Sequence, residues 1–405
     1  MRQAVKENRN MKLKIMKVSH DNVIDTLITI TFLIVLCQSI PSFLFANQVA
    51  STAMIYIGFF LSALLWILKF GVQKKCVEGS TITFFCIIIV CQFISTIISS
   101  NSKLTSVFLG FRFIFLAMLT TDTKLNYKVV RLVYYLFYGY MVYSIFTGSV
   151  ARELVNTVSQ NNITIIGISL LVLLYVASYQ NNRQIEILLS VLPMFVAVWA
   201  ATRIGVLIGV FLIVCQFIFG DASREKKKQR IKMLLGLALI SACGLFVFSK
   251  TDMWDSFTFQ YSYKISHAGS LLDDVRWRIV VEYIDACFSN PIYFLFGASY
   301  NNVELIHLFA NNPHNMFISL HANFGIVGFV MILFALTKAC FCFFKKNKVY
   351  LVALIALLLS GFGNICGFPG LYDPLLFYFI IVGCLRRSTG GEYQTESLAN
   401  VRRKS

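Results

Sequence analysis

The chain has 405 residues, of which 57% are hydrophobic and only 14% are charged. A soluble globular domain carries about 25% charged residues, so the composition excludes an ordinary soluble protein. The formal net charge of +17 would suit a nucleic-acid-binding protein, but the distribution of that charge along the chain indicates another cause.

Apolar stretches of roughly 16 to 22 residues recur along the whole chain, and each is long enough to cross a bilayer or nearly so. We therefore expect an all-α integral membrane protein with about twelve transmembrane helices, about nine in 23–248 and about three in 313–386. The expected starts lie near Val23, Met54, Ile82, Leu104, Val129, Ile163, Ile185, Ile204, Ile231, Pro313, Tyr350 and Leu371. The stretches at Ile204 and Tyr350 are short or lie close to a neighbour.

Lysine and arginine gather in alternate connecting segments, among them 1–22, 224–232, 345–348 and the tail 387–405. The positive-inside rule places such segments in the cytoplasm. We therefore expect both termini to be cytoplasmic and the one large loop, 249–312, to be periplasmic. The basic charge then reflects topology, and no nucleic-acid partner is expected.

Most of the 11 cysteines lie inside apolar stretches, and the sequence has no C-x-x-C motif. We interpret them as small apolar packing residues and expect no metal site. Cys287 and Cys366 both fall on the expected outer side, and whether they pair stays open.

The segment Asn312-Pro313-His314-Asn315 stands where the outer loop meets the next apolar stretch. Asn312 suits the N-cap and Pro313 the first helical position, which would place His314 in the first turn. The positive end of the helix dipole would keep the imidazole neutral, as a general base for a hydroxyl group requires. A histidine that only caps or anchors the helix at the lipid headgroups explains the same residues, and this alternative stays open.

The outer loop contains one amphipathic pattern, from about Leu271 to Ser289, with apolar residues three and four positions apart. Arg278 shares a helix face with Asp274 and Glu282, so we expect a salt-bridged surface residue. Arg276 instead projects with the apolar stripe and has no acidic helical neighbour. A guanidinium in that position needs an acidic partner or a bound anion.

Three further residues are candidates for a site. Arg203 follows Thr202 at the start of an apolar stretch, where the helix N–H groups favour a phosphate-like anion, although an arginine there also reaches lipid headgroups. Arg112 lies in the middle of an apolar stretch, where a charge costs at least about 2.5 kcal/mol and needs a polar cavity or partner. His321 follows His314 by two helical turns and shares its helix face.

Three blocks of residues occur in a characteristic order. They are Thr202-Arg203 followed by Leu207, then Arg276 followed by Asn290-Pro291 and Gly297, then Pro313-His314-Asn315 followed by Gly325-Ile326-Val327-Gly328. Because these three blocks occur in this order and on the expected side of the membrane, the chain resembles the O-antigen polymerase (Wzy) and O-antigen ligase (WaaL) superfamily. It departs from that pattern at Val280, where the family often has an aromatic residue, and at 296–298, where the family has G-x-G.

The resemblance implies an inverting, metal-independent glycosyltransferase without a cofactor, at the periplasmic face of the bacterial inner membrane. Its donor would be an undecaprenyl-diphosphate-linked oligosaccharide, and a chain-length regulator protein would be a partner beside the membrane lipid. In this scheme His314 is the catalytic residue, Arg203 and Arg276 hold the donor diphosphate, and Arg112, His321 and Asn315 are secondary candidates.

Within that family we expect a polymerase, which transfers a growing glycan onto the next lipid-linked repeat unit. A ligase, which transfers the same glycan to lipid A-core, is the close alternative. A flippase or other transporter would favour charges distributed through the spans and internal symmetry. Here the apolar stretches are nearly free of charge apart from Arg112, which favours a transferase.

Overall fold

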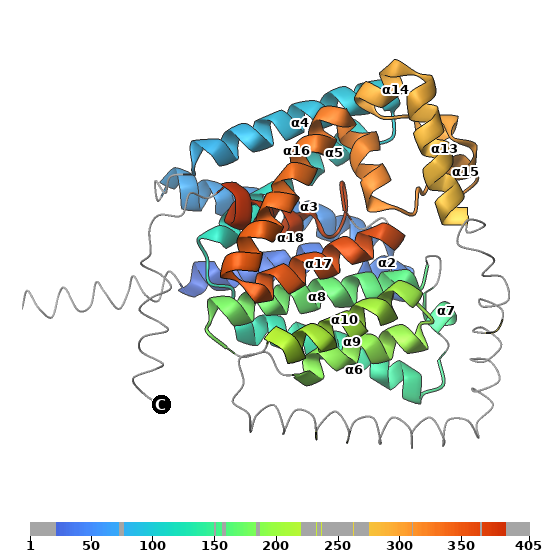
Figure 1. Cartoon of the computed structure of the whole chain (residues 1–405). Helices are drawn as coiled ribbons and strands as arrows, with labels where there is room; N and C mark the ends of the chain where they lie inside the picture. Colours follow the sequence, from blue (N-terminus) through green and yellow to red (C-terminus); the bar gives the residue numbers. More distant parts are fainter. Residues whose placement is uncertain are drawn as a thin grey trace, which may run out of the picture.

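The computed structural model describes residues 22–72, 77–149, 151–155, 159–183, 187–219, 275–309, 311–364 and 367–385, with the single positions 232, 236 and 262. Every regular element within these ranges is a helix, as the sequence predicts (Figure 1). The basic segment 1–21, the expected span near Ile231, the first part of the large loop (249–274) and the tail 387–405 lie outside the described residues, apart from those single positions.

Seven of the described helices are long and apolar enough to cross a membrane. They are Asn22–Ser42, Gln48–Gly71 (α3 and its π-helical end), Gly79–Ser99 (α4), Leu104–Thr121 (α5), Tyr127–Phe146 (α6), Asn161–Gln180 (α8) and Met316–Lys346 (α16). Four shorter apolar helices lie at the remaining described span positions: α9 (Ile187–Trp199), α10 (Arg203–Phe219), α17 (Lys348–Gly363) and α18 (Asp373–Ile380). This set of helices has the composition of a multi-pass membrane protein.

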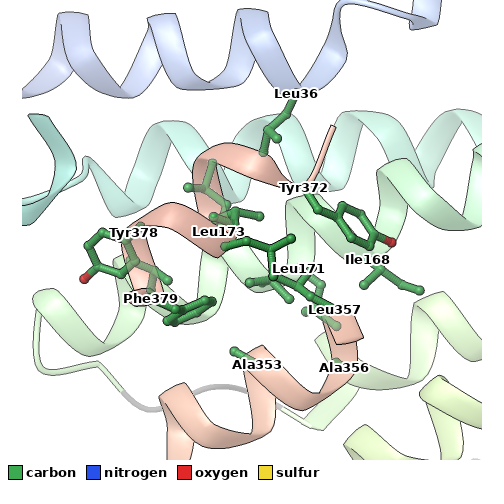
Figure 2. Packing of buried hydrophobic residues seen from close by; sticks show 14 of the residues in the cluster. Leu36, Ile168, Leu171, Leu173, Ala353, Ala356, Leu357, Tyr372, Tyr378 and Phe379 are labelled. Carbon is green, nitrogen blue, oxygen red and sulfur yellow. The ribbon is translucent and has the colours of Figure 1, made fainter. Parts of the chain in front are cut away.

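Helix α8 lies at the centre of the core, and every residue from Ile163 to Ser178 is buried. A helix that is apolar all round has no face for solvent and is expected to be enclosed by others. Helices α6, α9 and α17 pack around it. Figure 2 shows Leu171 and Leu173 of α8 beside Leu357 of α17 and Phe379 of α18. The apolar core therefore depends on close packing of the short helices α17 and α18 against the longer spans.

The peripheral helices expose large apolar side chains. On α4 these include Ile94 and Ile97, and on α16 they include Val327 and Val330. Apolar patches of this extent on a soluble monomer would favour association, whereas in a bilayer they contact acyl chains. The exposed faces of these helices thus match the membrane location that their length indicates.

A group of short helices lies at one end of the bundle, where Figure 1 shows α13, α14 and α15 together. Their bounds are Val275–Ser289, Pro291–Phe296 and Glu304–Leu308, and a single 3-10 turn spans Tyr300–Asn302. Ile279, Tyr283 and Cys287 of α13 form a second small core with residues of α15 and the beginning of α16. The two other short helices, α2 (Ile40–Phe45) and α7 (Ala151–Leu154), lie elsewhere in the chain.

Helix α13 confirms the expected amphipathic helix from Val275 onward, while its expected beginning at 271–274 lies outside the described residues. Arg278 is exposed, as expected, and of its two expected acidic neighbours Asp274 lies outside the described residues. The Glu282 carboxylate accepts a hydrogen bond from the Leu305 N–H, with 3.2 Å between Oε2 and N. Leu305 lies in the first turn of α15, where an acidic group satisfies an otherwise unpaired N–H.

Helix α16 is broken at Gly325, whose backbone has φ 65° and ψ −178°. A Cβ atom at Gly325 would lie 2.5 Å from the Leu295 carbonyl oxygen, and one at Gly297 (φ 90°) would lie 2.6 Å from the Ala322 carbonyl oxygen. Only glycine combines a positive φ with so close an approach of two backbones. These two glycines allow the end of α14 to dock against the break in α16.

Candidate functional site

His314 lies in the loop before α16, and its expected place in the first helical turn is wrong. The helix begins at Met316, and its N-cap is Asn315, whose Oδ1 accepts hydrogen bonds from the N–H groups of Phe317 (2.8 Å) and Ile318 (3.3 Å). Asn312 Oδ1 accepts from the His314 N–H at 2.9 Å and so closes a turn of its own. His314 has φ 49°, a left-handed backbone conformation that cannot form part of a right-handed helix.

The His314 ring contacts Phe309 edge to face, with 5.7 Å between ring centroids. Next to it, Asn315 Nδ2 donates a hydrogen bond to the Phe362 carbonyl oxygen of α17 at 3.4 Å. The histidine is therefore held between a loop residue and the capped start of a long helix. Asn315 acts as a positioning residue, because its side chain both caps α16 and contacts α17.

A cavity of about 780 Å³ lies between α13, α14, the beginning of α16 and the end of α17. Arg276, His314, Asn315 and His321 all line it, so the structure brings together four of the six residues that the sequence singled out. The rest of the wall is largely apolar and aromatic: Trp277, Val280, Ile284, Phe288, Phe294, Phe317, Ile318, Ile326, Phe329 and Phe362, with Tyr283 and Cys287. A few polar groups in an otherwise apolar wall suit an amphiphilic ligand.

Arg276 reaches the last residue of α17. Its Nη1 atom lies 3.3 Å from the position that a Cβ atom would take on Gly363. The C-terminal end of a helix carries partial negative charge, which stabilises a neighbouring guanidinium. Gly363 thus leaves room for a cation at the edge of the cavity.

Arg203 is exposed and is the first residue of α10. Arg203 does not line the cavity. The Cβ atom of its neighbour Ile204, however, lies 3.7 Å from the position that a Cβ atom would take on Gly363. The starts of α10 and α13 therefore meet at the end of α17, and the two arginines that were expected to hold one diphosphate lie in the same region. Thr202 precedes α10 as expected, although its hydroxyl contacts Thr164 Oγ1 at 2.8 Å.

His321 has both ring nitrogens engaged. Nε2 lies 2.9 Å from the Phe294 carbonyl oxygen, and Nδ1 lies 2.8 Å from the Tyr283 hydroxyl. A carbonyl oxygen only accepts, so Nε2 carries the proton, and Nδ1 of the neutral ring accepts from the Tyr283 O–H. His321 thus links α16 to α13 and α14, and it is a positioning residue.

Two groups beside His321, the Tyr283 hydroxyl and the Cys287 thiol, stay protonated. Burial raises the pKa of the Tyr283 hydroxyl well above its ordinary range and also raises the pKa of the Cys287 thiol. Cys287 is a free cysteine with its Sγ 3.8 Å from His321 Nδ1. Cys366, its expected possible partner, lies outside the described residues.

Arg112 is not part of the cavity. Its side chain is buried in the bundle, where it donates hydrogen bonds to Gln38 Oε1 at 3.2 Å and to the Leu109 carbonyl oxygen, and it lies 4.2 Å from the Phe113 ring centroid. The buried carboxylate of Asp373 is its electrostatic partner. The two terminal nitrogens of Arg112 therefore have polar partners inside the bundle, while its buried Nε has none among the described residues.

Sequence reasoning missed a polar junction between the turn that joins α4 to α5 and the broken helix α16. Asn101 Nδ2 donates to the carbonyl oxygens of Ala298 (2.8 Å) and Ala322 (3.2 Å). Ser102 Oγ donates to Asn323 Oδ1 at 2.6 Å. A polar Asn323 inside an apolar stretch was the signal available, since an amide there needs partners. This junction fixes the break in α16, and with it the cavity wall.

Comparison with protein-family models, curated proteins and solved structures gave no significant match. Within the described ranges, no three His, Cys, Asp or Glu side chains lie close enough together to bind a metal ion. The cavity and its lining residues are therefore the features from which a function of this chain can be inferred.

Proposed function

We propose that the chain is a glycosyltransferase of the O-antigen polymerase and ligase type, which uses an undecaprenyl-diphosphate-linked glycan as donor. The observation that supports this best is the large apolar cavity with Arg276 and His314 in its wall. A ligand with a long hydrocarbon chain, a diphosphate and a sugar has the chemistry that such a wall would recognise.

In the proposed reaction, the acceptor hydroxyl oxygen attacks the anomeric carbon of the donor sugar from the side opposite the diphosphate. The bond between that carbon and the diphosphate oxygen breaks, and the diphosphate leaves with the electron pair. His314 takes the proton of the attacking hydroxyl. Because the attack comes from the side opposite the leaving group, the configuration at the anomeric carbon inverts. Arg276 and Arg203 stabilise the charge that develops on the diphosphate.

Because the diphosphate is a good leaving group, the reaction needs no strong general acid. We propose the bacterial inner membrane as the location, with both termini in the cytoplasm and the active site at the periplasmic face. Asn315 and His321 support the reaction indirectly, by holding His314 and the cavity wall in place. A chain-length regulator would act on the polymer from outside the site.

We prefer polymerase over ligase, and strain complementation distinguishes them. The gene is expressed in a polymerase-null and in a ligase-null strain that share the donor, and surface polysaccharide is resolved by gel electrophoresis. A polymerase restores the ladder of chain lengths in the first strain only. Rescue of the ligase-null strain alone would assign the ligase activity, and rescue of neither strain would contradict the proposed reaction in that donor system.

A further inference from the structure

Helix α13 carries a second apolar stripe that the protein core does not cover. Besides the buried face of Ile279, Tyr283 and Cys287, the stripe is formed by Trp277, Val281, Ile284 and Phe288, with exposed fractions of 49%, 42%, 45% and 75%. These positions are four, three and four residues apart, so they form one continuous line along the helix.

The polar residues of α13 form a third line. Arg278, Glu282, Asp285 and Ser289 repeat with the same spacing. At 3.6 residues per turn, this polar line lies about 100° from the exposed apolar stripe. The helix therefore has one face toward the protein, one apolar face toward its surroundings and one polar face, which is the pattern of a helix lying at the boundary of water and lipid.

Helix α14 continues the exposed apolar stripe. It has no buried residue, and Ile292, Phe294 and Leu295 are all exposed. It packs against α4 and α16, and Figure 1 shows it at the end of α4. The exposed Ile94 and Ile97 of α4 extend the apolar surface into the candidate spans.

The position at which α14 packs along α16 indicates how deep α14 lies in a bilayer. Gly325, where α14 docks, would place a Cβ atom 3.1 Å from Phe296 Cα and 3.1 Å from Ser95 Oγ of α4. The part of α16 from Gly325 to Lys346 is about 32 Å long at 1.5 Å per residue. That length is close to the thickness of the bilayer hydrocarbon core, about 30 Å, so a bilayer whose core begins at the Lys346 end would place Gly325 and α14 near its other edge.

We propose that α13 and α14 form an interfacial helix pair, whose stripe of Trp277, Val281, Ile284 and Phe288 contacts the acyl chains of the adjacent leaflet. Three residues of this stripe, Trp277, Ile284 and Phe288, also line the cavity. The cavity therefore opens sideways onto lipid, and a lipid-linked ligand reaches it from within the membrane plane. Lipid contact at this surface does not depend on the glycan transfer proposed above.

Trp277 supplies a native probe of this contact. Replacing Trp66, Trp199 and Trp254 by Phe leaves it as the sole tryptophan of the chain. The variant is reconstituted into phosphatidylcholine vesicles with brominated acyl chains, and quenching by bromine is compared with quenching by aqueous acrylamide. We expect strong quenching by bromines near the glycerol end of the acyl chain, weaker quenching by deeper bromines and little by acrylamide.

The matched control moves the tryptophan to the polar line, by combining Trp277→Phe with Asp285→Trp in the same background. We expect this control to be quenched by acrylamide and only weakly by bromine. Equal behaviour of the two positions would overturn the proposal, because it would place both faces of α13 in the same medium. Protection of Trp277 from both quenchers would overturn it too, since a protein partner would then cover the stripe.

A second measurement uses the unmodified chain, in case the tryptophan replacements prevent folding. A phosphatidylcholine with a photoactivatable diazirine in its acyl chain is irradiated in vesicles that hold the protein, and the labelled residues are found by mass spectrometry. Labels on Val281, Ile284, Phe288 or Ile292, with none on Arg278, Asp285 or Ser289, are expected. Labels confined to the candidate spans, with none on α13 or α14, would contradict lipid contact.

Discussion

The guanidinium of Arg276 lies against the backbone of Gly363, with 3.3 Å between Nη1 and the position of a Cβ atom on the glycine. The two residues come from different helices, α13 and α17, and Ile204 of α10 approaches the same point. The helices α13 and α10, which carry the proposed anion-binding residues Arg276 and Arg203, therefore meet at the end of α17.

A methyl group at this point displaces Arg276 by a few tenths of an ångström. We therefore expect Gly363→Ala to reduce glycan transfer by about tenfold, because small shifts of a positioning group cost rate steeply. The variant should fold and accumulate normally, since the contact involves the end of a flexible side chain. The measurement is polymer formed per amount of membrane protein.

The control for this variant is Gly139→Ala on α6, where a Cβ atom would meet nothing within 4 Å. It should leave transfer unchanged. Equal activity of both alanine variants and the wild type would show that the position of Arg276 does not limit the reaction.

His321 is expected to contribute to stability rather than to proton transfer. His321→Ala removes the partner of the buried Tyr283 hydroxyl and of the Phe294 carbonyl oxygen, which costs about 1–3 kcal/mol of unfolding free energy. Tyr283→Phe removes the donor to His321 Nδ1, but the Cys287 thiol, with Sγ 3.8 Å from Nδ1, still faces that acceptor, so the cost should be about 1 kcal/mol. Thermal unfolding of the purified protein in detergent compares the two variants.

A catalytic His321 would give a different pattern. Its alanine variant would then keep the melting temperature of the wild type and lose transfer activity. A positioning role predicts that both variants have a lower melting temperature than the wild type. It also predicts that Tyr283→Phe retains its activity per folded molecule.

Cys287 should react slowly with thiol reagents in the folded protein. Burial raises the pKa of its thiol, so at pH 8 a smaller fraction is the reactive thiolate than in the unfolded chain. Mass spectrometry of the peptide that contains Cys287, after timed treatment with N-ethylmaleimide, measures the rate. We expect alkylation to be much slower than in denaturant and to increase as the pH rises toward 10. A rate equal to that of the denatured chain would contradict the buried position.

Local patterns in the sequence predicted the helices and part of the cavity. Long apolar stretches define the seven candidate spans, and the three- and four-residue spacing in α13 indicates the helix that carries Arg276. The expected shared helix face of His314 and His321 is wrong, because His314 lies in the loop before α16, although both residues line one cavity. The spans and helix α13 depend on residues close together in the chain, so periodicity is sufficient to find them.

Other features depend on tertiary contacts. Asn312 and Asn315 are both good N-caps, and only the structure shows that Asn315 caps α16 while Asn312 closes the preceding turn. The meeting of Arg276 with Gly363 requires the packing of α13 on α17, which no local pattern encodes. For the same reason the sequence did not identify Gln38 as the partner of Arg112.

We propose that His314 carries out glycan transfer in the cavity that Arg276 also lines. The most direct measurement supplies a polyprenyl-diphosphate-linked oligosaccharide to the purified protein in vesicles and follows product by gel or mass spectrometry. We predict that His314→Ala lowers the rate by about 10²–10⁴-fold, while His307→Ala, an exposed histidine of α15 outside the cavity wall, keeps it. Transfer by His314→Ala at the wild-type rate would contradict the account.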